Sequence, residues 1–301
     1  MSDTILVINA GSSSIKFQLF AIAPGKQLDR RLKGQIEGIG TRPRLVASDA
    51  TGQRVIDKVW GTDEVGELHH ALDRLVVFLR EYVGRLPVAI GHRVVHGGPD
   101  FIEPTLLNSR VLDHLQRFVP LAPLHQPNNL APIRIVLERQ PHLLQVACFD
   151  TAFHRHHSEI ADRYAIPDRF YREGVRRYGF HGLSYEYIAS RIPQVAPEIG
   201  DHRVVVAHLG SGASMCALQG GKSIESSMGF TALDGLPIGT RPGQIDAGVV
   251  LYLMNEKGMS VKDVEHFLYN DCGLKGLSGI SNDVRDLLSS VDPRARLALD
   301  Y

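Results

Sequence analysis

Residues 4–20 read TILVINAGSSSIKFQLF, and this stretch decides the fold class. Residues 4–10 form an apolar run rich in β-branched side chains, and residues 14–20 alternate between apolar and polar side chains. The glycine and serines between the two runs are typical of a tight turn. We therefore predict two strands joined as a hairpin.

The hairpin turn carries residue types that bind phosphate groups. Gly11 allows a ligand to approach the backbone closely, the serines at 12–14 offer hydroxyl and amide donors, and Lys16 adds a positive charge. These residues favour a phosphate site. A serine-rich surface turn with an exposed lysine explains the spacing equally well.

The same device recurs later in the chain. Residues 203–219, RVVVAHLGSGASMCALQ, again predict a strand, a glycine-serine turn and a second strand. Hydrophobic periodicity and helix end signals predict the other elements: helices at 63–85, 109–118, 129–139, 245–256 and 261–269, and strands at 88–95 and 143–149. The sequence therefore indicates an α/β protein with an internal duplication.

Two familiar nucleotide motifs are excluded. Gly210-Ser211-Gly212 could open a dinucleotide-binding fingerprint, but Met215 replaces its third glycine and a strand follows instead of a helix. Gly221-Lys222-Ser223 resembles the end of a P-loop, but Cys216 occupies the place of the first glycine. Any nucleotide site must therefore be of another kind.

Composition and charge exclude several classes of function. The 33 Lys and Arg residues balance the 33 Asp and Glu residues, so no basic field is available to attract nucleic acid. No apolar run is long enough to span a membrane, and the first residues do not form a signal peptide. The three cysteines are isolated, which predicts buried free thiols in a reducing compartment, the cytoplasm.

Ionisable residues stand beside glycine or proline at the ends of several apolar runs, where α/β proteins place ligand-binding groups. The stretches are GHRVVHGG at 91–98, LHQPNN at 124–129, FDTAFH at 149–154, YGFHG at 178–182 and GTRPG at 239–243. Their arginines, histidines and aspartate favour a site that neutralises an anion. The histidine-rich run at 154–157 lacks a completing carboxylate or cysteine, so it predicts a solvated turn or helix start in preference to a metal site.

Six motifs, in this order, resemble the acetate and propionate kinase family: VINAGSSSIKFQLF, GHRVVHGG, FDTAFH, YGFHG, HLGSGAS and GTRPGQID. The resemblance spans essentially the whole chain. It implies an α/β duplicated actin-like (ribonuclease H-like) fold in two domains, residues 1–150 and 151–301, with the active site in the cleft between them. It also implies transfer of a phosphoryl group from ATP to acetate or propionate, with Mg²⁺ or Mn²⁺, by a homodimer.

The resemblance also implies residue roles by position. Catalytic roles are implied for Arg93, His125, Asp150, His181 and Arg241, with His181 contacting the phosphoryl group in flight. Contacts with ATP and its phosphates are implied for Asn9, Ser12, Ser14, Lys16, His208, Gly210, Ser211, Gly212, Asp283 and Arg285, and Asn9 is also implied to lie near the metal. A small acyl pocket is implied at Arg93, Val95, Leu124, Phe180 and Ala232.

These residue types suit the reaction. A carboxylate is already a nucleophile, so no strong general base is required. The catalyst must bring two anions together in line and spread the charge of a loose transition state. Two guanidinium groups, a histidine donor and Mg²⁺ can do this.

Several positions depart from the family pattern. Ser211 stands where an asparagine is usual, Tyr185 where a histidine is common, and Val284 where an aromatic residue lies near the adenine. Ala232 replaces a proline at the rim of the acyl pocket, which makes propionate a candidate substrate. One methylene changes binding in such a pocket by only about 1–3 kcal/mol.

The end of the chain is the largest departure. Family members continue beyond the point matching Tyr301, with an adenosine-binding segment, a magnesium-binding glutamate and a final helix. We therefore expect the second domain to be truncated, in a fragment or in a short relative that binds nucleotide without turnover. A kinase of the same fold acting on butyrate or a polyol is a further alternative, but the apolar pocket argues against a polyol.

Overall fold

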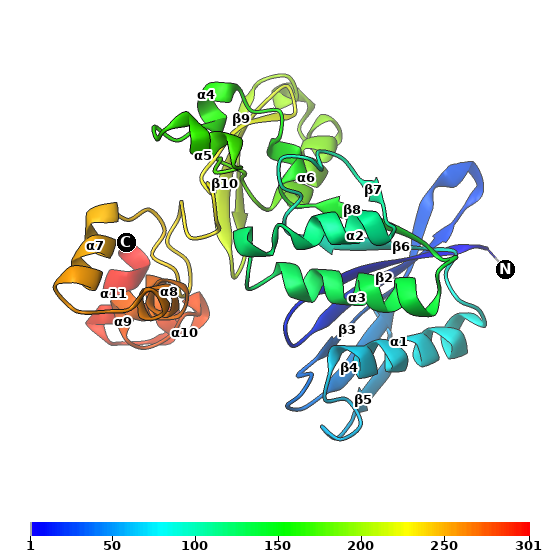
Figure 1. Ribbon diagram of the computed structural model, residues 1–301. Helices are drawn as coiled ribbons and strands as arrows, with labels where there is room; N and C mark the ends of the chain where they lie inside the picture. The colour runs from blue at the N-terminus through cyan, green and yellow to red at the C-terminus, as the bar shows by residue number, and fades with distance from the viewer. Residues whose placement is uncertain (1) are drawn as a thin grey trace. The chain divides into compact units, whose positions relative to one another are not determined.

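A computed structural model describes residues 2–301, except for the side chain of Lys26. Its contacts divide the chain into two compact units, with the boundary between Ala152 and Phe153 (Figure 1). We call them the N-terminal and the C-terminal unit. This division does not test the predicted functional domains, residues 1–150 and 151–301, which stay a prediction.

The N-terminal unit is built on an eight-stranded mixed sheet in the order β5-β4-β3-β2-β1-β6-β8-β7. The strands are β1 Thr4–Ala10, β2 Ile15–Ile22, β3 Leu28–Glu37, β4 Arg44–Asp49, β5 Arg54–Val59, β6 Ala89–Val94, β7 Thr105–Leu106 and β8 Leu144–Phe149. Strands β1, β6 and β8 are parallel to one another. The residues that follow these three strands therefore come together at one edge of the sheet.

Three helices pack against this sheet (Figure 1). They are α1 Leu68–Val83, α2 Ser109–Gln116 and α3 Gln126–Arg139, with 3₁₀ turns at Pro24–Lys26 and Val119–Leu121. Alternation along β1 buries Leu6 and Ile8, which join Leu75 and Leu79 of α1 in one core cluster. Burial of these apolar faces is the main stabilising term of the unit.

Two helices begin three or more residues away from their predicted starts. Helix α1 begins at Leu68, five residues later than predicted, because residues 62–64 form a turn. It ends at Val83, because Gly84 adopts the left-handed conformation that terminates a helix. Helix α3 begins at Gln126, three residues earlier than predicted, since Pro127 is tolerated in a first turn that needs no amide donor.

The C-terminal unit contains a three-stranded antiparallel sheet in the order β11-β10-β9 and eight α-helices among its described residues. The strands are β9 Arg203–Leu209, β10 Ala213–Gln219 and β11 Lys222–Ser226. The helices are α4 Glu159–Asp162, α5 Asp168–Arg172, α6 Gly182–Val195, α7 Ala247–Asn255, α8 Val261–Asn270, α9 Gly273–Ser278, α10 Val284–Ser289 and α11 Pro293–Asp300. Short 3₁₀ turns lie at Ala152–His154 and Pro197–Ile199. Helices α9, α10 and α11 pack on one another.

Both predicted hairpins are confirmed. Strands β1 and β2 pair antiparallel, with Ala10 opposite Ile15, and the amide of Gly11 donates to the carbonyl of Ser14 at 2.8 Å. Strands β9 and β10 pair antiparallel, with Leu209 opposite Ala213. Each unit therefore presents a glycine-serine turn at the tip of its own hairpin.

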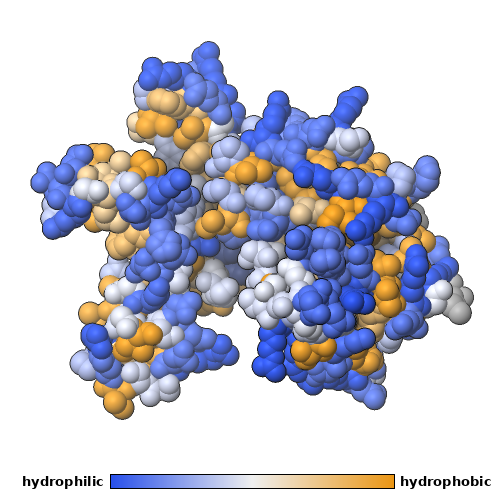
Figure 2. All heavy atoms as spheres, turned by 60° about the horizontal axis from the view of Figure 1, so that its bottom comes forward, coloured by the Kyte–Doolittle hydropathy of each residue, from blue (hydrophilic) through white to orange (hydrophobic). Residues whose placement is uncertain are grey.

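The three thiols are free, and Cys216 and Cys272 are buried, whereas Cys148 is half-buried. Across residues 2–301, no helix combines the length and apolar composition needed to cross a membrane. On the face drawn in Figure 2, apolar side chains form small patches among hydrophilic ones.

Candidate functional site

Arg93 is the centre of a charged cluster at the carboxyl end of β6. Its Nε lies 3.1 Å from both carboxylate oxygens of Asp150, and its Nη2 lies 2.5 Å from Oδ2. Its Nη1 donates to Oδ1 of Asn9 at 3.1 Å. Burial alone would lower the pKa of Arg93, but the charge and hydrogen bonds of the buried Asp150 outweigh it and raise the pKa. The guanidinium is therefore charged and held in one orientation.

Asn129 forms hydrogen bonds with the ends of β1 and β6 beside this cluster. Its Nδ2 donates to the carbonyl of Ala10 at 2.7 Å, and its Oδ1 accepts from the amide of Val95 at 2.9 Å. The side chain is buried, with 3% of its surface exposed. The sequence reasoning assigned it no role, although the stretch LHQPNN that contains it had been singled out.

Lys16 lies beside this cluster on the neighbouring strand. It is directly opposite Asn9 in the register of β1 and β2, so both side chains project from the same face of the sheet. They line an open concave surface of about 620 Å³, which also includes Lys33 and Gln35. Two ammonium groups in this concavity suit an anionic ligand. Ser12 is exposed and Ser14 half-buried in the adjoining turn.

The predicted acyl-pocket residues of this unit lie at two further places. Val95 follows β6 and is buried, whereas the side chain of Leu124 is 49% exposed just before α3. His125 is the residue that precedes the first turn of α3, and its amide donates to the carbonyl of Ala122. The roles of Val95 and Leu124 in acyl binding and of His125 in catalysis stay predictions.

In the C-terminal unit, two predicted histidines stack over the glycine-serine turn. The rings of His181 and His208 lie 4.2 Å apart at an interplanar angle of 21°. A Cβ atom on Gly212 would lie 3.2 Å from Nε2 of His181, and one on Gly210 would lie 3.3 Å from Nε2 of His208. The glycines therefore let the turn, which includes the exposed Ser211, approach both imidazole rings closely.

His181 occupies an unusual backbone position. With φ at 57°, it is the one non-glycine residue of positive φ among residues 2–301. It immediately precedes α6, and its Nδ1 lies 2.8 Å from Oγ of Ser214, which lies 2.5 Å from the hydroxyl of Tyr185. Tyr185, a departure from the family pattern, is thus part of the support of His181. The preceding residue, Phe180, which was predicted to line the acyl pocket, is 4% exposed.

Arg241 forms a separate group with Ala232. Its Nη1 donates to the carbonyl of Ala232 at 3.3 Å, and its guanidinium lies 5.5 Å from the ring centroid of Tyr269. Burial lowers the pKa of Arg241. A partly buried guanidinium attracts an anion more strongly than an exposed one does.

Asp283 and Arg285 bond each other at the start of α10. The carboxylate caps the helix by accepting from the amide of Arg285 at 2.8 Å, and the guanidinium lies 2.5 Å from Oδ2. The hydrogen bond from the Arg285 side chain lowers the pKa of Asp283 to about 2. The pair acts here as a helix cap, and its contact with adenosine stays a prediction.

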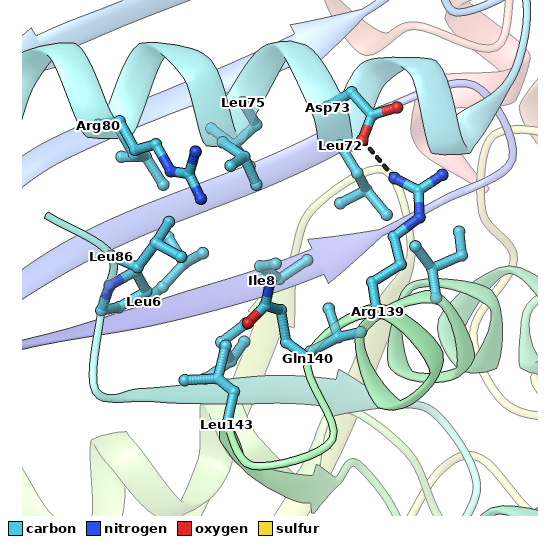
Figure 3. A pocket seen from close by; sticks show the side chains of 16 residues that line it. Leu6, Ile8, Leu72, Asp73, Leu75, Arg80, Leu86, Arg139, Gln140 and Leu143 are labelled. Atoms are coloured by element: carbon cyan, nitrogen blue, oxygen red, sulfur yellow. Dashed lines mark hydrogen bonds and ion pairs between the residues drawn. The ribbon is translucent and has the colours of Figure 1, made fainter.

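A second cavity of the N-terminal unit contains none of the predicted site residues. It has a volume of about 190 Å³ and lies between α1, α3 and the sheet (Figure 3). Leu6, Ile8, Leu72 and Leu75 line it, and an ion pair between Asp73 and Arg139 lies at its edge. Its apolar wall does not suit a phosphate.

Solved structures of an acetate kinase and a propionate kinase align with nearly the whole chain. An acetate kinase from Porphyromonas gingivalis aligns with 99% of this chain and 76% of its own, at a TM-score of 0.85 and 33% identity. A propionate kinase from Francisella tularensis aligns over the same shares at a TM-score of 0.89 and 37% identity. The chain therefore has the duplicated actin-like α/β fold that its motifs predicted.

Comparison with protein families and with curated sequences identifies the family of this chain. Residues 4–301 match the model of the acetokinase family. An acetate kinase of Nitrobacter hamburgensis is 62% identical over 99% of this chain and 74% of its own length, and one of Rhizobium meliloti is 56% identical over 99% and 76%. The chain belongs to the acetokinase family.

Proposed function

We propose that this chain is an acetate kinase, which transfers the γ-phosphoryl group of ATP to a carboxylate oxygen of acetate. The charged cluster of Arg93, Asp150 and Asn9 carries the proposal, because it presents a fixed guanidinium to an anion at the carboxyl ends of parallel strands. The acetate kinases that match the chain at 62% and 56% identity support acetate as the acceptor.

The reaction makes one bond and breaks one. A carboxylate oxygen of acetate attacks the γ-phosphorus, and the bond from that phosphorus to the oxygen bridging to the β-phosphate breaks, which leaves ADP and acetyl phosphate. The acceptor carries no proton that must be removed, so catalysis rests on positioning and on neutralising negative charge. Arg93 and Arg241 supply guanidinium groups for this purpose, and His181 donates a hydrogen bond to the group in transfer.

The remaining predicted residues bind the nucleotide or support the catalytic groups. Lys16 and the two glycine-serine turns, with Ser12, Ser14, Gly210, Ser211 and Gly212, contact the phosphates, and His208 supports His181 by stacking. Asp283 and Arg285 contact the adenosine. Asp150 and His125 act on the catalytic groups, with Asp150 holding Arg93 in place.

The residues near Arg93 fit a magnesium ion that the nucleotide brings with it. Asn9 and Asp150 each place an oxygen atom against the guanidinium of Arg93, so these oxygens lie close to one another. Mg²⁺ is commonly bound by one or two protein oxygens together with substrate phosphates and water. Within residues 2–301, no three acidic, histidine or cysteine side chains gather to hold an ion by themselves. A bound Mg²⁺ would neutralise phosphate charge, and Asn9 and Asp150 would hold it.

Acetate is favoured over propionate as the acceptor. The propionate kinase among the structural relatives is 37% identical to this chain, whereas the acetate kinase of Nitrobacter hamburgensis is 62% identical. Val95, Leu124, Phe180 and Ala232 are the residues that bind the acyl group in this proposal. Because a methylene changes binding by only about 1–3 kcal/mol, propionate is expected as a weaker second substrate.

A hydroxylamine trap for acyl phosphate tests the proposal. The chain is incubated with Mg·ATP and, in separate reactions, with acetate, propionate, butyrate or glycerol. Acetate is expected to give the most hydroxamate, and Arg241→Ala is expected to lower its rate by on the order of 10³-fold. Hydroxamate formation that survives in Arg241→Ala would contradict the role of this residue, and no hydroxamate with any acid would contradict the function.

The quaternary structure and the compartment are also proposed. We propose a homodimer, which light scattering of the purified chain tests by its mass relative to 33.2 kDa. The cytoplasm remains the compartment predicted from the free thiols.

A further inference from the structure

A buried hydrogen-bonded group lies behind the loop that carries His181. Oγ of Ser223 lies 2.8 Å from Nδ1 of His154, 2.8 Å from Nε2 of His157 and 3.2 Å from Sγ of Cys216. His154 and Ser223 are 0% and 2% exposed. The sequence predicted a solvated turn or helix start for the run 154–157, and for His154 the solvation is wrong, because its side chain is buried.

The partners fix the protons of Ser223 and of the two histidines. Nε2 of His154 lies 2.9 Å from the carbonyl oxygen of Phe180, which can only accept, so Nε2 carries the proton. Nδ1 of a neutral His154 then accepts from Ser223, and Ser223 accepts from Nε2 of His157. The thiol of Cys216 lies within reach of two acceptors, Ser223 and the carbonyl of Ala217. Burial favours this neutral form, since it lowers the pKa of His154 to about 3 and that of His157 to about 4.

The same segment holds the neighbouring carbonyls of the loop. Nη2 of Arg155 donates to the carbonyls of Arg177 and Tyr178 at 2.6 and 3.0 Å, while Nη1 pairs with the buried Asp162 at 2.8 Å. The loop also packs on the imidazole, because a Cβ atom at Gly179 would lie 2.7 Å from the ring of His154. Three of the four carbonyls from residue 177 to residue 180 are therefore held by two adjacent side chains.

We propose that His154 is a positioning residue, whose Nε2–H holds the carbonyl of Phe180 and so keeps His181 in its left-handed backbone conformation. The carbonyl of Phe180 belongs to the peptide unit that leads into His181, so rotation of that unit would change φ of His181 directly. The inference rests on the proposed role of His181 in phosphoryl transfer. Ser223 and His157 serve it by keeping the proton of His154 on Nε2.

Two substitutions of His154 separate this role from general packing. The amide nitrogen in His154→Gln reaches the place of Nε2 and can still donate to Phe180, whereas the shorter His154→Asn reaches only the place of Nδ1. His154→Asn is expected to lower kcat by on the order of 10²-fold, as for a misplaced catalytic group, with little change in KM for ATP or acetate. His154→Gln is expected to restore most of kcat, and the exposed His156→Gln is the control.

Equal kcat in the two variants would overturn the proposal, whether both match the wild-type chain or both fall together with the melting temperature. A spectroscopic test needs no activity: nitrogen NMR is expected to show His154 as the Nε2–H tautomer from pH 8 to pH 5. An Nδ1–H tautomer would overturn the proposal.

If the wild-type chain were inactive, this result would contradict the proposed function but would not test the role of His154. NMR would then decide the role of His154. The proposal stands if His154→Asn shifts the ring signals of His181 and His154→Gln leaves them in place, and it falls if neither or both shift them.

Discussion

Arg93 binds two partners with different edges of its guanidinium, Asp150 with Nε and Nη2 and Asn9 with Nη1. Arg93→Ala would leave the carboxylate of Asp150, only 2% exposed, without its counter-charge. We expect a loss of about 1–3 kcal/mol in the free energy of unfolding, the cost of an unsatisfied buried group. Urea titration followed by circular dichroism measures it. Activity is expected to fall by on the order of 10³-fold.

Arg93→Lys and Arg54→Ala are the informative comparisons. A lysine keeps the charge but loses the planar fork, so it is expected to restore stability in part and activity hardly at all. Arg54 pairs with Asp57 at the surface, with side chains 60% and 31% exposed, and its removal is expected to cost less than about 1 kcal/mol. Full activity in Arg93→Lys would contradict the account of this site.

Tyr185 supports His181 through one shared hydroxyl. Tyr185→Phe removes the hydrogen bond to Ser214, which leaves that hydroxyl to His181 alone. We expect the free energy of unfolding to fall by about 1 kcal/mol and kcat to fall severalfold. Tyr187→Phe is the matched control because Tyr187 lies two residues away with its side chain 63% exposed. Equal effects of the two substitutions would refute the role given to Tyr185.

Helix α9 is the element that holds the loop of Arg241. Amides of Leu274 and Lys275 donate to the carbonyls of Ile238 and Gly239 at 3.0 and 2.9 Å. Gly273 has φ of 61°, and a Cβ atom there would overlap the carbonyl oxygen of Ile238 and lie 2.7 Å from that of Arg241. Gly273→Ala is therefore expected to displace Arg241 and to lower kcat by on the order of 10²-fold.

Gly279→Ala, at the other end of α9, separates steric overlap from backbone strain. Gly279 has nearly the same φ, 62°, but a Cβ atom there would lie 3.5 Å from the nearest side-chain atom, Nη1 of Arg294. It is expected to cost about 1–2 kcal/mol of stability and to leave kcat unchanged. If both substitutions lower kcat equally, α9 does not position Arg241.

The elements that sequence reasoning predicted are those with a strong local signal. Strand β9 has the bounds of its Val-rich run, and α8 begins after Ser260, which forms a capping box with Asp263. Strands β3, β4 and β5 were not predicted. Strand β5 at the sheet edge is exposed at nearly every position, so pairing with β4 defines it where apolar alternation does not.

The sequence predicted which residues belong to the site, but it did not predict which of them contact one another. Arg93 and Asp150 are separated by 57 residues, and the sequence indicated only that each stands at the end of an apolar run. Ser223 is 69 residues from His154 and had been considered only as part of a failed P-loop. Its role depends on a pairing of distant segments that no local pattern encodes.

At the scale of the whole molecule, buried neutral histidines make both units sensitive to acid. Burial lowers the pKa of His92 in the N-terminal unit to about 4, and those of His154 and His157 in the C-terminal unit to about 3 and about 4. Unfolding returns each to about 6.5. Below that value the unfolded chain binds more protons, so stability is complete above pH 6.5 and is lost as the pH falls toward 4.

We expect the free energy of unfolding to fall between pH 7.5 and pH 5.5 by about 1 kcal/mol for each of these histidines. Urea titrations at several pH values measure the slope. His92→Gln is expected to reduce the slope, and the exposed His156→Gln is expected to preserve it. A flat profile over this range would show that the three histidines are not neutral and buried in solution.

The rate at which the thiol of Cys216 is alkylated reports how often the C-terminal unit opens. Burial raises its pKa to about 11, and the sulfur is enclosed beside Ser223, so the folded unit offers an alkylating reagent almost no thiolate. Reaction must wait for the unit to open. The labelling rate of Cys216 therefore measures how often the group of Ser223, His154 and His157 opens. A bound nucleotide that stabilises this group would lower the labelling rate, even when no product is formed.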